Sequence, residues 1–153
     1  MIAVDTNILV YAHRADSSWH EPASSVITEL AEGQSPWAIP WPCIYEFLAI
    51  VTHPRIYKPP TPVEDALVQV DRWLESPSVH LISDDDAFFE VVRPIVKASG
   101  VRGGAVHDAR IVALCVYHGV KKLLTADRDF SRFPQVRTEN PLIKRKNGER
   151  SGS

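Results

Sequence analysis

Four acidic side chains lie beside short apolar segments, in positions from which their carboxylates can reach a common cleft. They are Asp5, Glu46, Asp108 and Asp127, separated by long stretches of ordinary sequence. Asp5 and Asp127 directly follow apolar segments 2–4 and 122–125, which are typical of buried strands. Because neighbouring carboxylates repel one another, such a cluster requires a positive charge among them. Hard divalent cations prefer oxygen ligands, so the sequence predicts a metal-dependent enzyme.

Each of these acids also has an ordinary structural interpretation. Asp5 is suited to cap a helix and Asp127 to stabilise a turn. Asp108 stands at an expected helix start, where acids offset the helix dipole. An isolated helical glutamate such as Glu46 is usually a solvated surface residue, but the apolar neighbours of Glu46 leave little polar face there. The four acids taken together favour a shared site.

Polar residues beside the acids are suited to orient carboxylates and a metal-bound water. Thr6, Asn7 and Thr125 adjoin or closely follow the expected strand ends. Asp129, two residues after Asp127, is expected to be a supporting acid and not a primary ligand. The run Asp84-Asp85-Asp86 is instead expected to lie in the first turn of a helix.

The apolar patterns predict strands that alternate with helices. The clearest helix start is at Thr61, which fits an N-cap followed by Pro62 and Glu64, a capping box with its proline. Strands are expected at 2–4, 37–40, 79–82 and 122–125, the last as the final core strand. Helices are expected at about 8–12, 19–32, 42–52, 62–74, 84–100 and 106–118, the fourth with an apolar face of Val63, Ala66, Leu67, Val70 and Leu74.

This alternation predicts an α/β fold with a mostly parallel central sheet and helices on both faces. Ligands of such sheets bind outside the carboxyl ends of the strands, the edge where Asp5 and Asp127 are expected. The chain of 153 residues fits a single domain, which we place at 1–143. The polar, basic segment 144–153 is expected to be a flexible tail.

The bulk composition is that of a soluble globular protein, with 44% hydrophobic and 24% charged residues. The net charge of −2 provides no overall basic field for nucleic acid, although a local basic face is compatible with it. Cys43 and Cys115 lack partners at zinc-ligand spacing and are expected to be buried, reduced thiols. Without a secretory signal or a membrane-length apolar run, the protein is expected to be cytoplasmic.

Four motifs in this order resemble the PIN domain. They are Val4-Asp-Thr-Asn-Ile-Leu-Val-Tyr, Tyr45-Glu-Phe-Leu, His107-Asp-Ala-Arg-Ile-Val-Ala and Thr125-Ala-Asp-Arg-Asp-Phe. Each motif is short, but four of them in the right order in a chain of this size are specific. The resemblance extends from Met1 to about Pro134 and is greatest to the VapC-type toxins of bacterial toxin–antitoxin pairs.

The resemblance implies a single PIN-like domain with endoribonuclease activity. It also implies that Asp5, Glu46, Asp108 and Asp127 form a catalytic quartet that binds Mg²⁺ or Mn²⁺. Thr6, Asn7, Thr125 and Asp129 then support the quartet. The implied partners are an RNA substrate, a small antitoxin that occludes the active site, and a second copy of the chain in a homodimer. No membrane partner is implied.

Basic residues near the acids are candidates for contacts with RNA phosphates. They are Arg102, Arg110 and Arg128, and for each of them a salt bridge to a nearby acid is an equal alternative. Trp37 and Trp41 are able to stack on bases, although a place in the core or in a subunit interface is the more ordinary expectation. The six histidines show no ligand spacing, so no zinc site is expected.

Three other functions compete with the toxin hypothesis. One is a PIN nuclease for RNA processing that has no antitoxin. Another is a PIN module that binds RNA or protein without cleaving, which the presence of all four acids disfavours. The third is a phosphatase or response-regulator-like protein that uses one strand-end aspartate with Mg²⁺. The spread of four acids, with Glu46 on a helix, fits a nuclease better.

Overall fold

The computed structural model describes residues 1–143, and the predicted tail at 144–153 lies outside the described residues. Five parallel strands form one sheet in the order β3-β2-β1-β4-β5. The strands are β1 (Ile2–Val4), β2 (Trp37–Pro40), β3 (Val79–Ile82), β4 (Lys122–Leu124) and β5 (Arg137–Glu139). Since every strand runs the same way, all carboxyl ends meet at one edge, and β1 lies at the centre.

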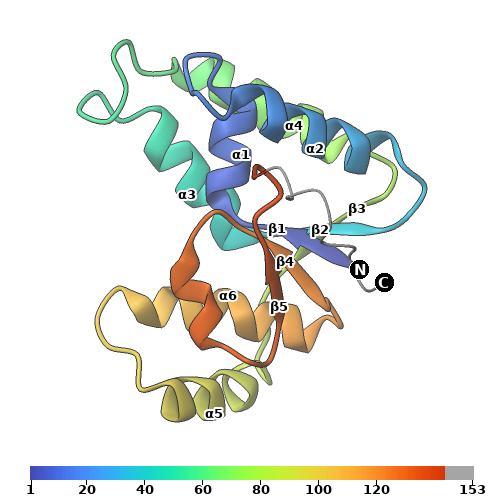
Figure 1. The fold of residues 1–153 in the computed structure, drawn as a ribbon, viewed down its shortest axis with the longest axis vertical. Coiled ribbons are helices and arrows are strands. Elements are labelled where there is room, and N and C mark those ends of the chain that lie inside the picture. Colours follow the sequence, from blue (N-terminus) through green and yellow to red (C-terminus); the bar gives the residue numbers. More distant parts are fainter. Residues whose placement is uncertain (144–153) are drawn as a thin grey trace.

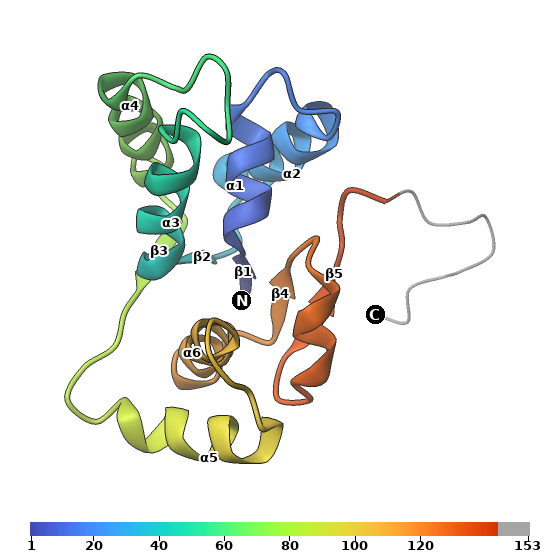
Figure 2. The same cartoon turned by 90° about the vertical axis from the view of Figure 1, so that its left-hand side faces the viewer.

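Helices cover both faces of this sheet, as the sequence predicted. In Figure 1, α1 to α4 lie above the sheet and α5 and α6 below it, and the quarter-turn in Figure 2 shows the same layers. The helices are α1 (Thr6–His13), α2 (His20–Glu32), α3 (Trp41–Val51), α4 (Val63–Leu74), α5 (Phe89–Ser99) and α6 (Ala105–Tyr117), followed by a short 3-10 helix, η1 (Arg128–Arg132). The predicted α/β class is therefore confirmed.

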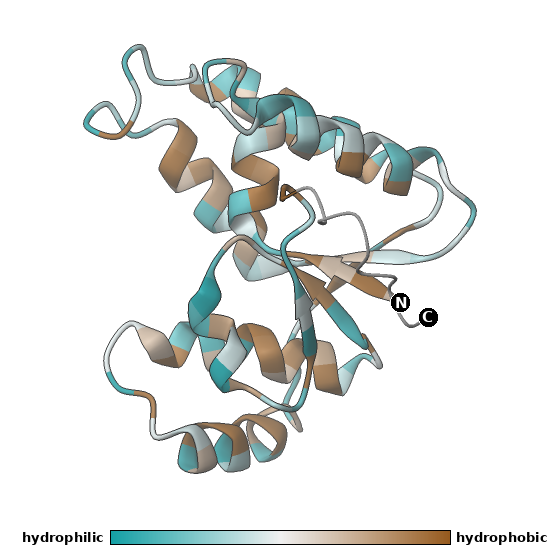
Figure 3. Ribbon diagram, in the orientation of Figure 1, coloured by the Kyte–Doolittle hydropathy of each residue, from teal (hydrophilic) through white to brown (hydrophobic). Residues whose placement is uncertain are grey.

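The core follows from the apolar faces of these elements. Trp37 on β2 and Phe47 on α3 are fully buried, and the ring of Phe47 packs edge-on against Trp73 of α4 with centroids 4.7 Å apart. Figure 3 shows hydrophobic residues on β1 and along α3 and α6, whereas the edge strand β5 is mostly hydrophilic. Cys43 and Cys115 are buried and free, as expected. Within the described part of the chain, no helix is long and apolar enough to cross a membrane.

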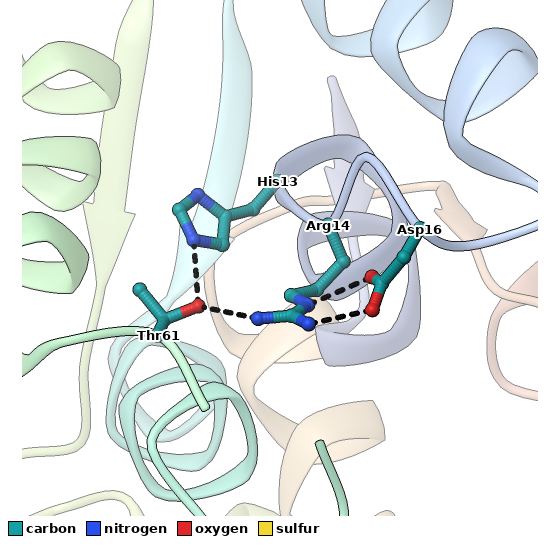
Figure 4. Close-up of polar contacts among 4 residues, drawn as sticks. All are labelled: His13, Arg14, Asp16 and Thr61. Atoms are coloured by element: carbon teal, nitrogen blue, oxygen red, sulfur yellow. Dashed lines mark hydrogen bonds and ion pairs between the residues drawn. The ribbon is translucent and has the colours of Figure 1, made fainter. Parts of the chain in front are cut away.

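The predicted capping box at Thr61 is wrong. Helix α4 begins at Val63, its N-cap is Pro62, and no side chain caps it. The hydroxyl of Thr61 instead lies 3.1 Å from Nε2 of His13 and accepts a 3.1 Å hydrogen bond from Nη1 of Arg14. Figure 4 shows these contacts, which tie the loop before α4 to the end of α1. The Thr61 hydroxyl therefore contacts residues distant in sequence and not the first turn of α4. A local sequence motif cannot reveal such distant contacts.

Three other details differ from the predicted elements. Helix α5 begins at Phe89, so the run Asp84-Asp85-Asp86 precedes it, and the carboxylate of Asp85 caps the turn before it by accepting from the amide of Ala87. A fifth strand, β5, follows the strand predicted to be the last. The buried face of α4 consists of Ala66, Val70 and Trp73, whereas Val63, Leu67 and Leu74 are exposed.

Candidate active site

Asp5 lies at the carboxyl end of the central strand and caps helix α1. Its Oδ1 accepts a 2.8 Å hydrogen bond from the amide of Thr6, and its Oδ2 accepts one of 2.8 Å from the hydroxyl of Thr125. The side-chain amide of Asn7 also donates to Oδ2, at 3.3 Å. Only 7% of the residue is exposed. The carboxylate is therefore held in one orientation at the point where β1 meets α1.

Burial raises the pKa of Asp5 to about 6. The hydrogen bonds from Thr125 and Thr6 oppose this rise, while the negative charges of Glu46 and Asp108 add to it. Because the charges of Glu46 and Asp108 change the pKa of Asp5, the three carboxyl groups are close enough to interact electrostatically. A proton or a bound cation would relieve the repulsion among them.

Thr125 and Asn7 connect the ends of β1 and β4. The hydroxyl of Thr125 accepts hydrogen bonds from the Asn7 side chain at 3.2 Å and from the amide of Asp127 at 3.0 Å. Oδ1 of Asn7 accepts from the amide of Ala126 at 3.1 Å. These contacts fix the backbone that carries Asp127 relative to Asp5.

The other two members of the predicted quartet come from helices on opposite faces of the sheet. Glu46 lies in the middle of α3, and its Oε2 accepts a 3.1 Å hydrogen bond from the hydroxyl of Thr6. Asp108 lies in the first turn of α6. Burial raises the pKa of Asp108, and the charges of Asp127, Asp129 and Glu46 raise it further.

A single cavity of about 510 Å³ brings the four predicted acids together. It opens at the carboxyl edge of the sheet, between α3 and α6. Its lining includes all four acids, with Thr6, Asn7, Pro42, Tyr45, Ile50, Gly104, His107, Arg110, Ile111 and Phe130. Thr125 does not line the cavity but donates a hydrogen bond to Asp5, which does. Asp129 is exposed and does not line the cavity.

Comparison with known proteins identifies a family for most of the chain. The family model described as PIN domain matches residues 2–136, nearly the whole described structure. The chain belongs to the PIN-domain family. This agrees with the resemblance found in the four motifs.

Several similar proteins are named VapC ribonucleases. Ribonuclease VapC43 of Mycobacterium tuberculosis is 31% identical over 142 residues, which cover 93% of this chain and 96% of that protein. Ribonuclease VapC48 of the same species is 29% identical, with 90% and 95% of the two chains covered. The crystal structure of VapBC2 from Rickettsia felis, bound to a DNA fragment from their promoter, has a TM-score of 0.65 at 20% identity. The superposition covers 91% of this chain and 98% of the matched chain in that crystal structure, which shows that the two share a fold.

The acids of this PIN domain combine structural roles with a place in the cavity. Asp5 is the N-cap of α1, and Asp127 is the N-cap of η1, where its Oδ1 accepts from the amide of Asp129 at 2.8 Å. The alternative interpretations of Asp5 and Asp127 are therefore correct as local descriptions. They do not compete with a site, because capping uses one carboxylate oxygen and leaves the side chain at the cavity.

The donor set of the PIN domain suits a hard divalent cation, because four carboxylates line one cavity and two of them have raised pKa values. Among residues 1–143, however, no three His, Cys, Asp or Glu side chains are grouped closely enough to hold an ion as they stand. The chemistry of the donors fits a metal, and the side chains would have to converge on it.

The three candidate arginines are placed differently. Arg110 lines the cavity, but its Nη2 lies 3.2 Å from Oδ2 of Asp84 in a partly exposed ion pair. Arg102 is exposed in the loop before α6. Arg128 is exposed beside a neighbouring hollow that Thr125 and Asp127 also line. The salt-bridge alternative therefore describes Arg110 in this structure.

Two residues at the site were missed in the sequence. The charge of Arg132 opposes the raised pKa of Asp108, and only the turn of η1 brings it there. Tyr45 lines the cavity beside Glu46, a neighbour in sequence that could have drawn notice. Of the two candidate stacking tryptophans, Trp37 is fully buried in the core, whereas Trp41 stacks on Tyr45.

Proposed function

We propose that this protein is a metal-dependent endoribonuclease and the toxin of a toxin–antitoxin pair. The observation that carries the proposal is the cavity at the carboxyl edge of the sheet. Asp5 and Asp127 line it from beyond the ends of β1 and β4, and Glu46 and Asp108 line it from α3 and α6. The similarity to VapC ribonucleases supports RNA as the substrate. The domain responsible is proposed to be residues 1–143.

The proposed cofactor is Mg²⁺ or Mn²⁺, held by the carboxylates of Asp5, Glu46, Asp108 and Asp127. When bound, a divalent cation would lower the pKa of an attacking water and neutralise charge on the phosphate. Without a cation, the four carboxylates would repel an RNA phosphate, so the acids account for a metal requirement in both binding and cleavage.

The protein's own groups orient and move protons in this proposal. Thr125, Asn7 and the amide of Thr6 fix the orientation of the Asp5 carboxylate at the cavity. The Thr6 hydroxyl fixes Glu46 in the same way. Asp108 or Asp127 is proposed to accept the proton of the attacking water, because both carboxylates line the cavity where that water would be held.

The substrate's phosphates are proposed to contact Arg102, Arg110 and Arg128. Arg102 and Arg128 are exposed, and Arg110 would exchange its ion pair with Asp84 for a phosphate. An exposed ion pair of this kind contributes little stability, so the exchange costs little.

The proposed partners are a small antitoxin that occludes the cavity and a second copy of the chain in a homodimer. An antitoxin must cover or fill the opening between α3 and α6 to block access to the acids. The proposal also locates the protein in the cytoplasm, where cellular RNA is available as a substrate.

Incubation of purified protein with total cellular RNA tests the proposal. Any co-purifying small partner is first removed under conditions that leave the protein folded. Discrete fragments are expected with Mg²⁺ or Mn²⁺ and none with EDTA, and mapping their ends would identify the cleaved RNA. Intact RNA under every metal condition would reject nuclease activity and leave a binding module as the better hypothesis.

A further inference from the structure

Tyr45 is an exposed aromatic side chain in the wall of the acidic cavity. It immediately precedes Glu46 on α3, lines the cavity together with Asp5 and Asp108, and is 65% exposed. Core packing does not explain its position, because most of its surface faces solvent. Large aromatic groups left open beside polar groups in a cavity are typical of ligand contacts.

Trp41 supports the Tyr45 ring from one side. The two residues are one helical turn apart on α3, and their rings are stacked with centroids 6.1 Å apart and planes inclined by 26°. Trp41 is itself partly buried and packed against the hydrophobic core. The Tyr45 ring is therefore braced, while most of its side chain remains accessible.

A nucleotide combines the chemistry of the cavity with that of the ring. Its phosphate requires the cation that the carboxylates are proposed to hold, and its base offers a flat face. Bases of single-stranded RNA stack readily on aromatic side chains, which is how many proteins hold unpaired nucleotides. On the far side of the cavity, the exposed His107 of α6 also lines the wall.

We propose that Tyr45, braced by Trp41, is a stacking platform for a base next to the scissile phosphate of a single-stranded RNA substrate. The inference rests on the proposed ribonuclease function and adds a substrate contact to it. An RNA strand is favoured over a protein surface as the occupant because Tyr45 and the four acids share one cavity. A single nucleotide can use both features, with its phosphate at the acids and its base on the ring.

Stacking on this platform contributes to substrate binding before and during cleavage alike. Removal of the ring should therefore raise KM while leaving kcat nearly unchanged. Because every base has an aromatic face, the contact should tolerate different bases and should depend on the presence of a base more than on its identity.

The first test compares wild type, Tyr45→Phe and Tyr45→Ala on a short RNA that spans a mapped cleavage site. Trp19→Ala is the matched control, because Trp19 is an exposed aromatic outside the cavity lining. We expect Tyr45→Ala to raise KM about tenfold, and Tyr45→Phe and Trp19→Ala to resemble wild type. Fluorescence anisotropy in Mg²⁺, with a labelled RNA that carries a non-hydrolysable linkage at the mapped site, should show the same order of affinities.

The second test removes the base and not the ring. RNAs with an abasic nucleotide at each position near the cleavage site are compared for wild type and Tyr45→Ala. At one position, the abasic substitution should weaken wild-type binding about tenfold and abolish the difference between the two proteins. An equal effect of Tyr45→Ala on all these RNAs would overturn the proposal, because it would show that the ring acts through the fold.

The remaining outcomes separate this inference from the proposed function. Cleavage by wild type with unchanged KM for Tyr45→Ala would overturn the platform alone. A change of oligomeric state in Tyr45→Ala on gel filtration, with unchanged RNA affinity, would assign the ring to a protein interface and also overturn it. Failure of wild type to cleave any RNA would instead reject the proposed function.

Discussion

The hydroxyl of Thr125 donates a 2.8 Å hydrogen bond to the carboxylate of Asp5, across the ends of the paired strands β4 and β1. The same hydroxyl accepts from the side chain of Asn7 and from the amide of Asp127. One buried oxygen thus determines the positions of two acids that are distant in sequence. The parallel register of β1 and β4 provides this arrangement, because it brings both carboxyl ends to the same edge.

Thr125→Val should therefore damage both stability and the site. The variant keeps the shape of the side chain but removes the acceptor of the Asp127 amide, one of the two acceptors of the Asn7 side chain, and a donor to Asp5. We expect a loss of about 1–3 kcal/mol in the free energy of unfolding, measured in urea, together with reduced RNA cleavage. Thr138→Val, at a half-buried position on the neighbouring β5, is the control. Equal stability losses in the two variants would contradict a special role for Thr125.

The pH dependence of stability should reveal the buried Asp5. Its pKa is raised from 3.8 to about 6, so the folded protein retains a proton that the unfolded chain releases near pH 4. The stabilisation from this proton is complete below about pH 4 and is lost as the pH rises through 6. In EDTA, the unfolding free energy of wild type relative to Asp5→Asn should fall by about 2 kcal/mol between pH 4 and pH 7. A difference that does not change with pH would contradict the burial of a titrating carboxyl group.

Divalent cations should stabilise the wild-type fold at neutral pH. A cation bound by the acids relieves their repulsion, and tenfold excess over its dissociation constant contributes about 1.4 kcal/mol. We expect thermal unfolding to shift upward with Mg²⁺ or Mn²⁺ for wild type and for Asp65→Asn, which alters an exposed acid on α4. Asp108→Asn should lose most of the shift. The same shift in Asp108→Asn as in wild type would exclude Asp108 from the metal site.

Replacement of Arg14 by lysine should lower the stability of the fold even though the positive charge is kept. Its guanidinium makes hydrogen bonds of 2.9 and 2.6 Å to Asp16, contacts the hydroxyl of Thr61, and stacks 4.3 Å from the ring centroid of Tyr57 (Figure 4 shows the polar contacts). A lysine cannot reproduce this planar, forked contact. Arg14→Lys should cost about 1–2 kcal/mol and speed hydrogen exchange at the Thr61 amide, which bonds to the carbonyl of Val51.

The control for this prediction is Arg93→Lys, which alters an exposed arginine on α5 with a 3.9 Å contact to Glu90. Because exposed ion pairs contribute little, Arg93→Lys should leave both measurements nearly unchanged. If Arg14→Lys were as stable as wild type and exchanged the Thr61 amide at the same rate, the cluster would not hold the loop.

Periodicity and strand-end position predicted the sheet and directed attention to acids that line one cavity. The alternation of strands and helices decides that β1 and β4 end at one edge, so the places of Asp5 and Asp127 follow from local patterns. Glu46 and Asp108 were harder to place, since their convergence depends on how α3 and α6 pack on opposite faces. For these two, the motif resemblance carried information that spacing alone did not.

The errors share a physical cause. Thr61 had the sequence of a helix cap, but contacts with His13 and Arg14, distant in sequence, use its hydroxyl instead. The strand β5 is only three residues long and carries charged side chains, so its pairing with β4 depends on the sheet edge and leaves no periodic signal. Arg132 reaches the electrostatic environment of Asp108 only through the turn of η1.

The most direct test of the account is metal-dependent RNA cleavage by single carboxamide variants of the four cavity acids. Wild type and the control Asp65→Asn should release the same discrete fragments with Mg²⁺ or Mn²⁺. Asp5→Asn, Glu46→Gln, Asp108→Asn and Asp127→Asn should each lower the cleavage rate by about 100-fold or more while remaining folded by circular dichroism. Wild-type cleavage rates in folded Asp5→Asn or Asp108→Asn would contradict the claim that this cavity is the active site.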